Sequence, residues 1–261
     1  HGTEPEGAAP FVTAKSLTVE LKLLSGLSQA IDLRRLAIEE PRINIIVNAD
    51  GSTNIPSPRV KTEPSPKTPL ETVVDLAVDR FELNRGLVRF ADRKIPLDAR
   101  GENITARLDY RAAAPRYEGK LTVTPLHLRL ANNQPLDLDV SLPVTIERNR
   151  VQLAAGRVAT QLSEILLDLQ LIDLRNPVIT AHAKAKLAIV DANRFAGLNL
   201  NANGEVLAAD AAVRLQDGVL NVESARVNFG GSTIEASGPL NQGIEFDTAL
   251  DLAQEIGRAH V

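Results

Sequence analysis

The sequence predicts a mostly β protein, a long antiparallel meander of amphipathic strands with one or two short helices. Apolar and polar residues alternate with a period of two along much of the 261-residue chain, as expected of strands with one buried and one solvated face. Turn-forming Gly, Asn and Asp separate these segments. The chain has only six Phe, two Tyr and no Trp. Long strands and few aromatic residues favour an elongated sheet, although a sandwich or a barrel would show the same alternation.

The segment 136–146 shows the alternation most clearly. Its apolar side chains all occupy even positions, namely Leu136, Leu138, Val140, Leu142, Val144 and Ile146. At about 3.3 Å per residue this strand would be roughly 35 Å long. Pro143, on the polar face, has no N–H to donate to a neighbouring strand, which predicts a sheet edge or a bulge there.

Further segments alternate in the same way, over residues 104–110, 126–130, 179–189 and 244–252. Polar turns tolerate the positive φ of tight hairpins, and they are predicted at residues 84–86, 201–204, 216–218 (with Asp217 and Gly218) and 230–232.

Helical segments are rare. One short helix is predicted over residues 191–197, with Asp191 as its N-cap and Gly197 as its stop. Residues 23–30 are a second candidate helix. The rest of the chain carries the strand pattern or turn residues.

A Pro-rich stretch divides the chain. Residues 55–69 contain five prolines among Lys, Ser and Glu, which predicts a solvated loop or linker. It separates an N-terminal strand region, residues 11–54, from a longer β region, residues 70–254. The absence of Cys excludes a disulfide scaffold, a thiol nucleophile and a Cys-ligated metal. The net charge of −4 is spread along the chain, which argues against a nucleic-acid partner.

Both ends of the sequence are unusual. The chain has no Met, even at position 1, so we expect a fragment or a processed form. No apolar run reaches the roughly 20 residues of a membrane-spanning helix. The last seven residues, 255–261 (EIGRAHV), read as the translation of a common sequencing adapter. We therefore expect them to be an artefact and not natural protein.

Three sequence phrases follow one another along the chain. They are LAIEEPRINI with DGSTN (residues 36–45 and 50–54), FELNRGLVRFAD (residues 81–92), and LQDGVL with VNFGGSTIEASG (residues 215–220 and 227–238). In this order and spacing they resemble the AsmA-like family of bacterial envelope proteins, the group of AsmA and TamB. The resemblance covers most of residues 11–254. The N-terminal membrane helix typical of the family is absent from this sequence.

The resemblance implies a curled, open β-sheet with a taco-like groove that is apolar inside and polar outside. It implies a periplasmic protein, anchored in the inner membrane by a helix missing from this chain. The implied partner is phospholipid, carried between the inner and outer membranes. An alternative is assistance in the assembly of outer-membrane β-barrel proteins. A structural β-sandwich of the cell surface is a third hypothesis, and it predicts a closed, tightly packed core.

The candidate functional residues are apolar positions of the alternating segments, which would form the floor of such a groove. They are Ile104, Leu108, Leu126, Leu128, Leu138, Val140, Leu142, Ile179, Ala181, Ala183, Leu187, Ile189, Phe246 and Leu250.

The first phrase is predicted to be architectural. Pro41 favours an extended strand. The turn at Asp50 and Gly51 lets the chain reverse, and Asn54 can bond to nearby backbone. No two His residues have the spacing of metal ligands. No metal, cofactor or catalytic residue is therefore expected.

Overall fold

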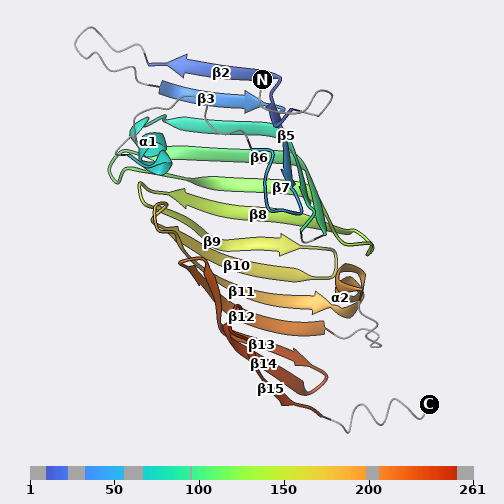
Figure 1. Ribbon diagram of the computed structural model, residues 1–261. Helices are drawn as coiled ribbons and strands as arrows, with labels where there is room; N and C mark the ends of the chain where they lie inside the picture. The colour runs from blue at the N-terminus through green and yellow to red at the C-terminus, as the bar shows by residue number, and fades with distance from the viewer. Residues whose placement is uncertain (1–9, 23–32, 56–66, 95, 198–205, 252–261) are drawn as a thin grey trace.

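One open β-sheet contains most of the residues that the structure describes (Figure 1). The computed structural model describes residues 10–22, 33–55, 67–94, 96–197 and 206–251. The sheet has 15 strands, is mostly antiparallel and does not close into a barrel. It is elongated, running from β2 at one end to β15 at the other. The predicted β meander and open sheet are confirmed. The candidate helix at 23–30, the turn at 201–204 and the segment 255–261 lie outside the described residues.

Most strands are long. In chain order they are β1 (Val12–Thr13), β2 (Ser16–Leu21), β3 (Leu33–Glu39), β4 (Arg42–Val47), β5 (Arg80–Asp92), β6 (Leu97–Arg111), β7 (Arg116–Leu130), β8 (Leu136–Ile146), β9 (Arg150–Ala159), β10 (Glu164–Ile172), β11 (Val178–Ala188), β12 (Val206–Gln216), β13 (Val219–Phe229), β14 (Ser232–Pro239) and β15 (Glu245–Ala249). Helix α1 (Pro69–Asp75) lies between β4 and β5, and α2 (Ile189–Ala196) follows β11.

The N-terminal strands join the sheet in a different way from the others. From β5 onwards each strand pairs antiparallel with the next. By contrast, β3 and β4 both pair in parallel with β5 and share its outer edge. Arg35 lies opposite Arg80 at one end of this ladder, and Val47 lies opposite Asp92 at the other. Residues on both sides of the Pro-rich segment therefore belong to one sheet.

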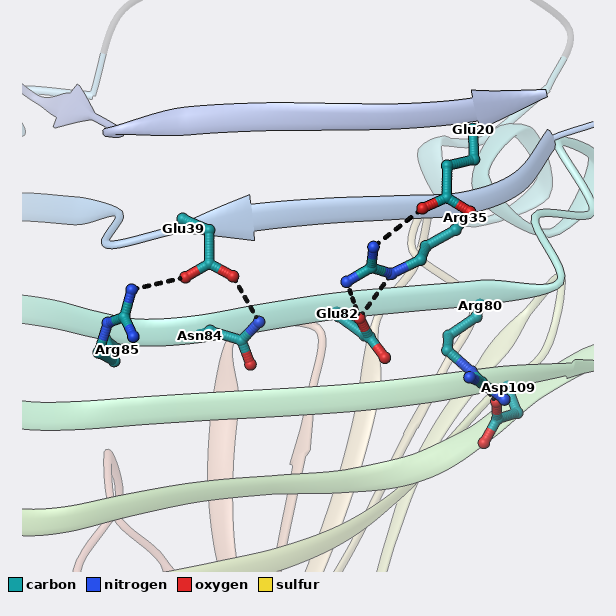
Figure 2. Close-up of polar contacts among 8 residues, drawn as sticks. All are labelled: Glu20, Arg35, Glu39, Arg80, Glu82, Asn84, Arg85 and Asp109. Carbon is teal, nitrogen blue, oxygen red and sulfur yellow. Dashed lines mark hydrogen bonds and ion pairs between the residues drawn. The ribbon is translucent and has the colours of Figure 1, made fainter.

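Polar side chains hold β3 between β2 and β5 (Figure 2). Arg35 on β3 donates a hydrogen bond from Nε to Glu82 Oε2 at 2.7 Å and another from Nη1 to Glu20 Oε1 at 2.9 Å. These two carboxylates raise the pKa of Arg35, Glu20 more than Glu82. Glu39, further along β3, accepts a hydrogen bond from Asn84 Nδ2 at 2.8 Å. The side-chain ladder thus specifies the register of three neighbouring strands.

Irregularities line up across neighbouring strands in the N-terminal half of the sheet. Glu40, Arg85 and Asn103 have φ angles of 47°, 52° and 47°. The pairing of β5 with β6 shifts register around Arg85 and Asn103, and the pairings of β7 with β8 and of β8 with β9 also shift. A bulge bends a strand and increases its twist, so this line of bulges curls the sheet.

Three turn and bulge predictions have clear outcomes. The predicted turn at residues 84–86 is wrong, because β5 continues through it and Arg85 forms a bulge. Positive φ serves a bulge as well as a turn, so residue types alone did not separate the two. Pro143 lies at a bulge, as predicted, on a strand that is paired on both sides. The hairpin at Asp217 and Gly218 is confirmed, with φ angles of 52° and 75°.

The helices depart from the sequence prediction. Helix α1 was not predicted, although it begins with a capping box: Thr68 Oγ1 accepts from the Glu71 N–H at 3.2 Å, and Glu71 Oε2 accepts from the Thr68 N–H at 2.8 Å. Helix α2 ends at Gly197, as predicted, with a φ of 66°. Its N-cap is Ala188 and not Asp191, which lies inside the first turn.

Candidate functional site

One face of the sheet is apolar from β2 to β14. The strand registers align one residue from each of twelve strands, β2, β3 and β5 to β14, in a row that crosses the strands. In order these residues are Val19, Leu36, Phe81, Leu108, Gly119, Val144, Leu153, Leu169, Ala181, Val213, Val222 and Gly238. With neighbouring strands about 4.8 Å apart, the row is roughly 50 Å long. None of its members carries a polar side chain.

This apolar face forms the floor of an open groove. Its most deeply buried side chains gather in two patches, one formed by Tyr117 with residues Val74 and Val78, and one formed by Val123, Leu138 and Val140. Elsewhere on the face the side chains are mostly half-buried, and at the two ends of the sheet Val19 and Phe246 are 48% and 69% exposed. A second sheet packed on this face would bury them. The closed sandwich is therefore not the architecture of the described residues.

The structure brings most of the predicted groove residues to this face. On β6, β7, β8, β11 and β15 they are Ile104, Leu108, Leu126, Leu128, Leu138, Val140, Leu142, Ile179, Ala181, Ala183, Leu187 and Phe246. Leu250 follows the end of β15 and is 61% exposed.

Ile189 is a correction to the predicted floor. Strand β11 ends at Ala188, and Ile189 begins α2 with its side chain buried. An apolar residue at this position suits the last step of a strand and the first turn of a helix equally well. The alternation therefore could not locate the boundary.

Helix α1 covers the floor at one end of the strands. The backbone N–H of Val78, just after the helix, donates to the Tyr117 hydroxyl at 2.8 Å, and burial raises the pKa of Tyr117. Asp75 pairs with Lys67 at 2.6 Å and with Arg148 at 2.9 Å. Hydrogen bonds from these two cations, first from Lys67, lower the pKa of the Asp75 carboxyl.

Helix α2 lies at the opposite end of the strands (Figure 1). Its Asp191 is only 5% exposed and accepts hydrogen bonds from Thr160 Oγ1 and Ser163 Oγ, both at 2.6 Å. Asn133, in the turn between β7 and β8, donates from Nδ2 to the Phe195 carbonyl at 2.8 Å. These bonds attach α2 to the ends of β7 to β10, so the two helices flank the groove.

The side chains on the floor become smaller towards the C-terminus. Across β11 to β14 the registers align a row of small residues, Ala183, Ala211, Ala225 and Ala236. On β11 and β12 the next pairs on this face are Ala185 with Ala209 on one side and Ala181 with Val213 on the other. Larger pairs lie one step further out, Leu187 with Leu207 and Ile179 with Leu215. The Ala row therefore forms a furrow that runs across the strands.

The polar turn after β4 closes the outer edge of that strand. The Asn54 side chain accepts from the Ile46 N–H at 2.8 Å and donates to the Asn44 carbonyl at 2.8 Å, as a neighbouring strand would. Pro41, earlier in the same phrase, is buried at the junction of β3 and β4.

The tip of the same turn has the conformation predicted for its residues. Gly51 has a φ of 84°, and the Asp50 carboxylate accepts from the Ser52 N–H at 2.9 Å. Hydrogen bonds from Ser52 lower the pKa of Asp50. This turn acts on the edge of the sheet, whereas Leu36, at the start of the same phrase, belongs to the apolar row.

The opposite face of the sheet is polar. Its histidines lie beside carboxylates on neighbouring strands: His127 Nδ1 is 2.6 Å from Asp137 Oδ1, and His182 Nε2 is 2.7 Å from Asp210 Oδ1. The described residues contain no group of His, Cys, Asp or Glu arranged to hold a metal ion. Neither described helix is long and apolar enough to cross a membrane.

Comparison with protein-family models, with curated proteins and with solved structures finds no match to this chain.

Proposed function

We propose that this chain is a periplasmic part of an AsmA-like envelope protein, anchored in the inner membrane, and that its groove carries phospholipid between the inner and outer membranes. The observation that supports this most directly is the unbroken apolar row from Val19 to Gly238, roughly 50 Å across twelve strands. The three AsmA-like phrases in the sequence support the family.

The chemistry of the floor suits acyl chains. Each methylene removed from water stabilises the bound chain by about 0.8 kcal/mol. A floor of Leu, Val, Ile and Ala offers similar contacts at every strand, so a sliding chain would meet no deep local minimum. The furrow over Ala183, Ala211, Ala225 and Ala236 leaves space for such a chain between larger side chains.

Assembly of outer-membrane β-barrel proteins is the alternative, and it requires a sheet edge open to a client strand. The last strand, β15, carries Glu245 and Asp247, and β2 carries Glu20. Charged residues on edge strands oppose pairing with other strands. The edges therefore support this alternative less than the floor supports lipid transport.

The proposal is tested on the purified chain by native mass spectrometry and by binding of a fluorescent phospholipid. Ala211→Asp places a carboxylate on the groove floor. Ala208→Asp is the matched control, since Ala208 lies on the same strand, on the polar face and exposed. We expect phospholipid to bind the wild-type protein and the Ala208→Asp variant, with at least about tenfold weaker binding to Ala211→Asp because a charge must be desolvated under the acyl chain.

Circular dichroism of both variants excludes unfolding as the cause of a loss. A wild-type chain that binds no phospholipid, or equal binding by the two Asp variants, would contradict the proposal.

A further inference from the structure

A basic hollow lies on the polar face, across β4, β5, β6 and β7. Its volume is about 890 Å³. The charged side chains and the histidine in its lining are Arg89, Arg93, Asp98, Arg100, His127 and Arg129. Cationic groups therefore outnumber the single carboxylate. The hollow lies on the other side of the sheet from the groove, so it is independent of the proposed lipid floor.

Three of these side chains face one another directly across the strands. Arg89 on β5 lies opposite Arg100 on β6, and Arg100 lies opposite His127 on β7. Residues directly opposite in an antiparallel pair have Cβ atoms about 5 Å apart, and like charges in that position are destabilising. The register therefore places two like-charged side chains opposite each other here, an arrangement that costs stability.

Elsewhere on this face the same arrangement is balanced by a carboxylate. Arg111 and Arg116 also lie directly opposite each other, and Glu118 bridges them, accepting from Arg111 Nε at 3.1 Å and from Arg116 Nε at 2.7 Å. The two guanidinium groups lower the pKa of Glu118, Arg111 contributing first. This cluster shows how an oxyanion stabilises an opposed arginine pair in this sheet.

Between Arg89 and Arg100 the described residues supply no such bridge. Arg100 pairs with Glu102 at 2.7 Å, and Arg129 pairs with Asp98 at 2.6 Å, whereas Arg89 and Arg93 have no ion pair among the described residues. All four arginines are exposed. Exposed ion pairs contribute about 0–1 kcal/mol, so Arg100 and Arg129 can exchange their partners for a ligand at little cost.

We propose that this hollow binds a phosphate group, with the oxyanion between Arg89 and Arg100 and with Arg93 and Arg129 at its rim. The planar guanidinium fork matches the oxygens of phosphate in a bidentate manner. The group could belong to a soluble phosphate ester or to a phospholipid headgroup at a membrane surface, and both sources present the same chemistry.

The test measures binding of inorganic phosphate and glycerol 3-phosphate by calorimetry, at constant ionic strength, to the whole chain. Arg89→Gln removes one half of the pair. Arg226→Gln is the matched control, because Arg226 is an exposed arginine on the same face that pairs with Glu235. We expect Arg89→Gln to raise the Kd at least about tenfold and Arg226→Gln to change it less than about twofold. Without phosphate, Arg89→Gln should leave the Tm unchanged or raise it, since it relieves the repulsion.

Vesicles distinguish the two sources of phosphate. Co-flotation with vesicles containing phosphatidic acid, absent with phosphatidylcholine alone and weakened by Arg89→Gln, would assign a headgroup. Tight binding of glycerol 3-phosphate without flotation would assign a soluble ester. If no phosphate probe binds, or if Arg89→Gln and Arg226→Gln weaken binding equally, the hollow is not a phosphate site. The calorimetry uses soluble phosphates and is independent of phospholipid in the groove, and the vesicle result is read from the difference between wild type and Arg89→Gln.

Discussion

The two halves of the apolar face differ although they follow the same alternation. Across β7 and β8 the floor is built from Val123, Leu138 and Val140, which are buried against one another and against neighbouring Leu and Val. Across β11 to β14 the corresponding central row is Ala, and its members are only half-buried. Register shifts occur in both halves, between β5 and β10 and again between β12 and β14. Large side chains therefore pack closely against one another in the first half, whereas small side chains leave the second half more open.

The first prediction contrasts one Leu from each half. Leu138→Ala removes a side chain that is 8% exposed, and we expect a loss of about 2–4 kcal/mol from the free energy of unfolding. Leu215→Ala, on half-buried β12, should cost about 1 kcal/mol, because less area is lost and the groove leaves no enclosed cavity. Urea denaturation of both variants measures the difference. Equal losses would show that the C-terminal floor is as closely packed as the N-terminal one.

The second prediction concerns the helix that covers the N-terminal half. Tyr117→Phe leaves the Val78 N–H without its acceptor, and we expect a loss of about 1–3 kcal/mol in unfolding free energy, as for other buried unsatisfied donors. Tyr110→Phe is the control. Tyr110 packs on the same cluster, with its ring centroid 5.2 Å from that of Tyr117, but the Val78 N–H donates to the Tyr117 hydroxyl.

Chemical denaturation measures both Tyr variants. A loss for Tyr110→Phe as large as that for Tyr117→Phe would mean that removing a hydroxyl from this cluster is costly in itself, whether or not it accepts from Val78.

Periodicity predicted which residues share a face within the alternating segments, and for β8 it predicted both ends of the strand. It could not predict which strands pair with each other, or in which direction. Parallel pairing of β3 and β4 with β5 depends on long-range contacts such as Arg35 with Glu82, and alternation is the same in parallel and antiparallel strands. It also missed α1, because seven residues make too few turns to show a helical period. The capping residues Thr68 and Glu71 were the available signal.

For the groove candidates, too, the alternation predicted the face but not the depth of burial. The period-two alternation placed Leu138, Ala183 and Phe246 on apolar faces, yet it gave no measure of how deeply each side chain would be buried. That depth depends on the curl, which arises at positive-φ residues such as Arg85 and Asn103. The basic hollow was missed because Arg89 and Arg100 are ordinary polar-face residues in the sequence, and only the strand register places them opposite each other.

The smallest expected effect is a pH-dependent loosening of α1, which would make the N-terminal floor more like the open C-terminal one. Lys67 and Arg148 hold the pKa of Asp75 below its ordinary value of 3.8. A carboxyl whose folded-state pKa is lowered contributes stability that is present above the unfolded pKa and is lost as pH falls through the folded pKa. We therefore expect the hydrogen-exchange protection factor of the Val78 amide to fall between pH 5 and pH 3, by at most about fivefold, as for exposed ion pairs.

Asp75→Asn isolates this contribution from other carboxylates with lowered pKa values, such as Glu118. The variant has no charge to lose, so its Val78 protection should be lower at pH 5 and should change less on acidification. If wild type and variant lose protection in parallel, Asp75 does not hold α1 on the floor. The attachment of the helix then depends on apolar packing and on the Tyr117 hydrogen bond, which the second prediction measures.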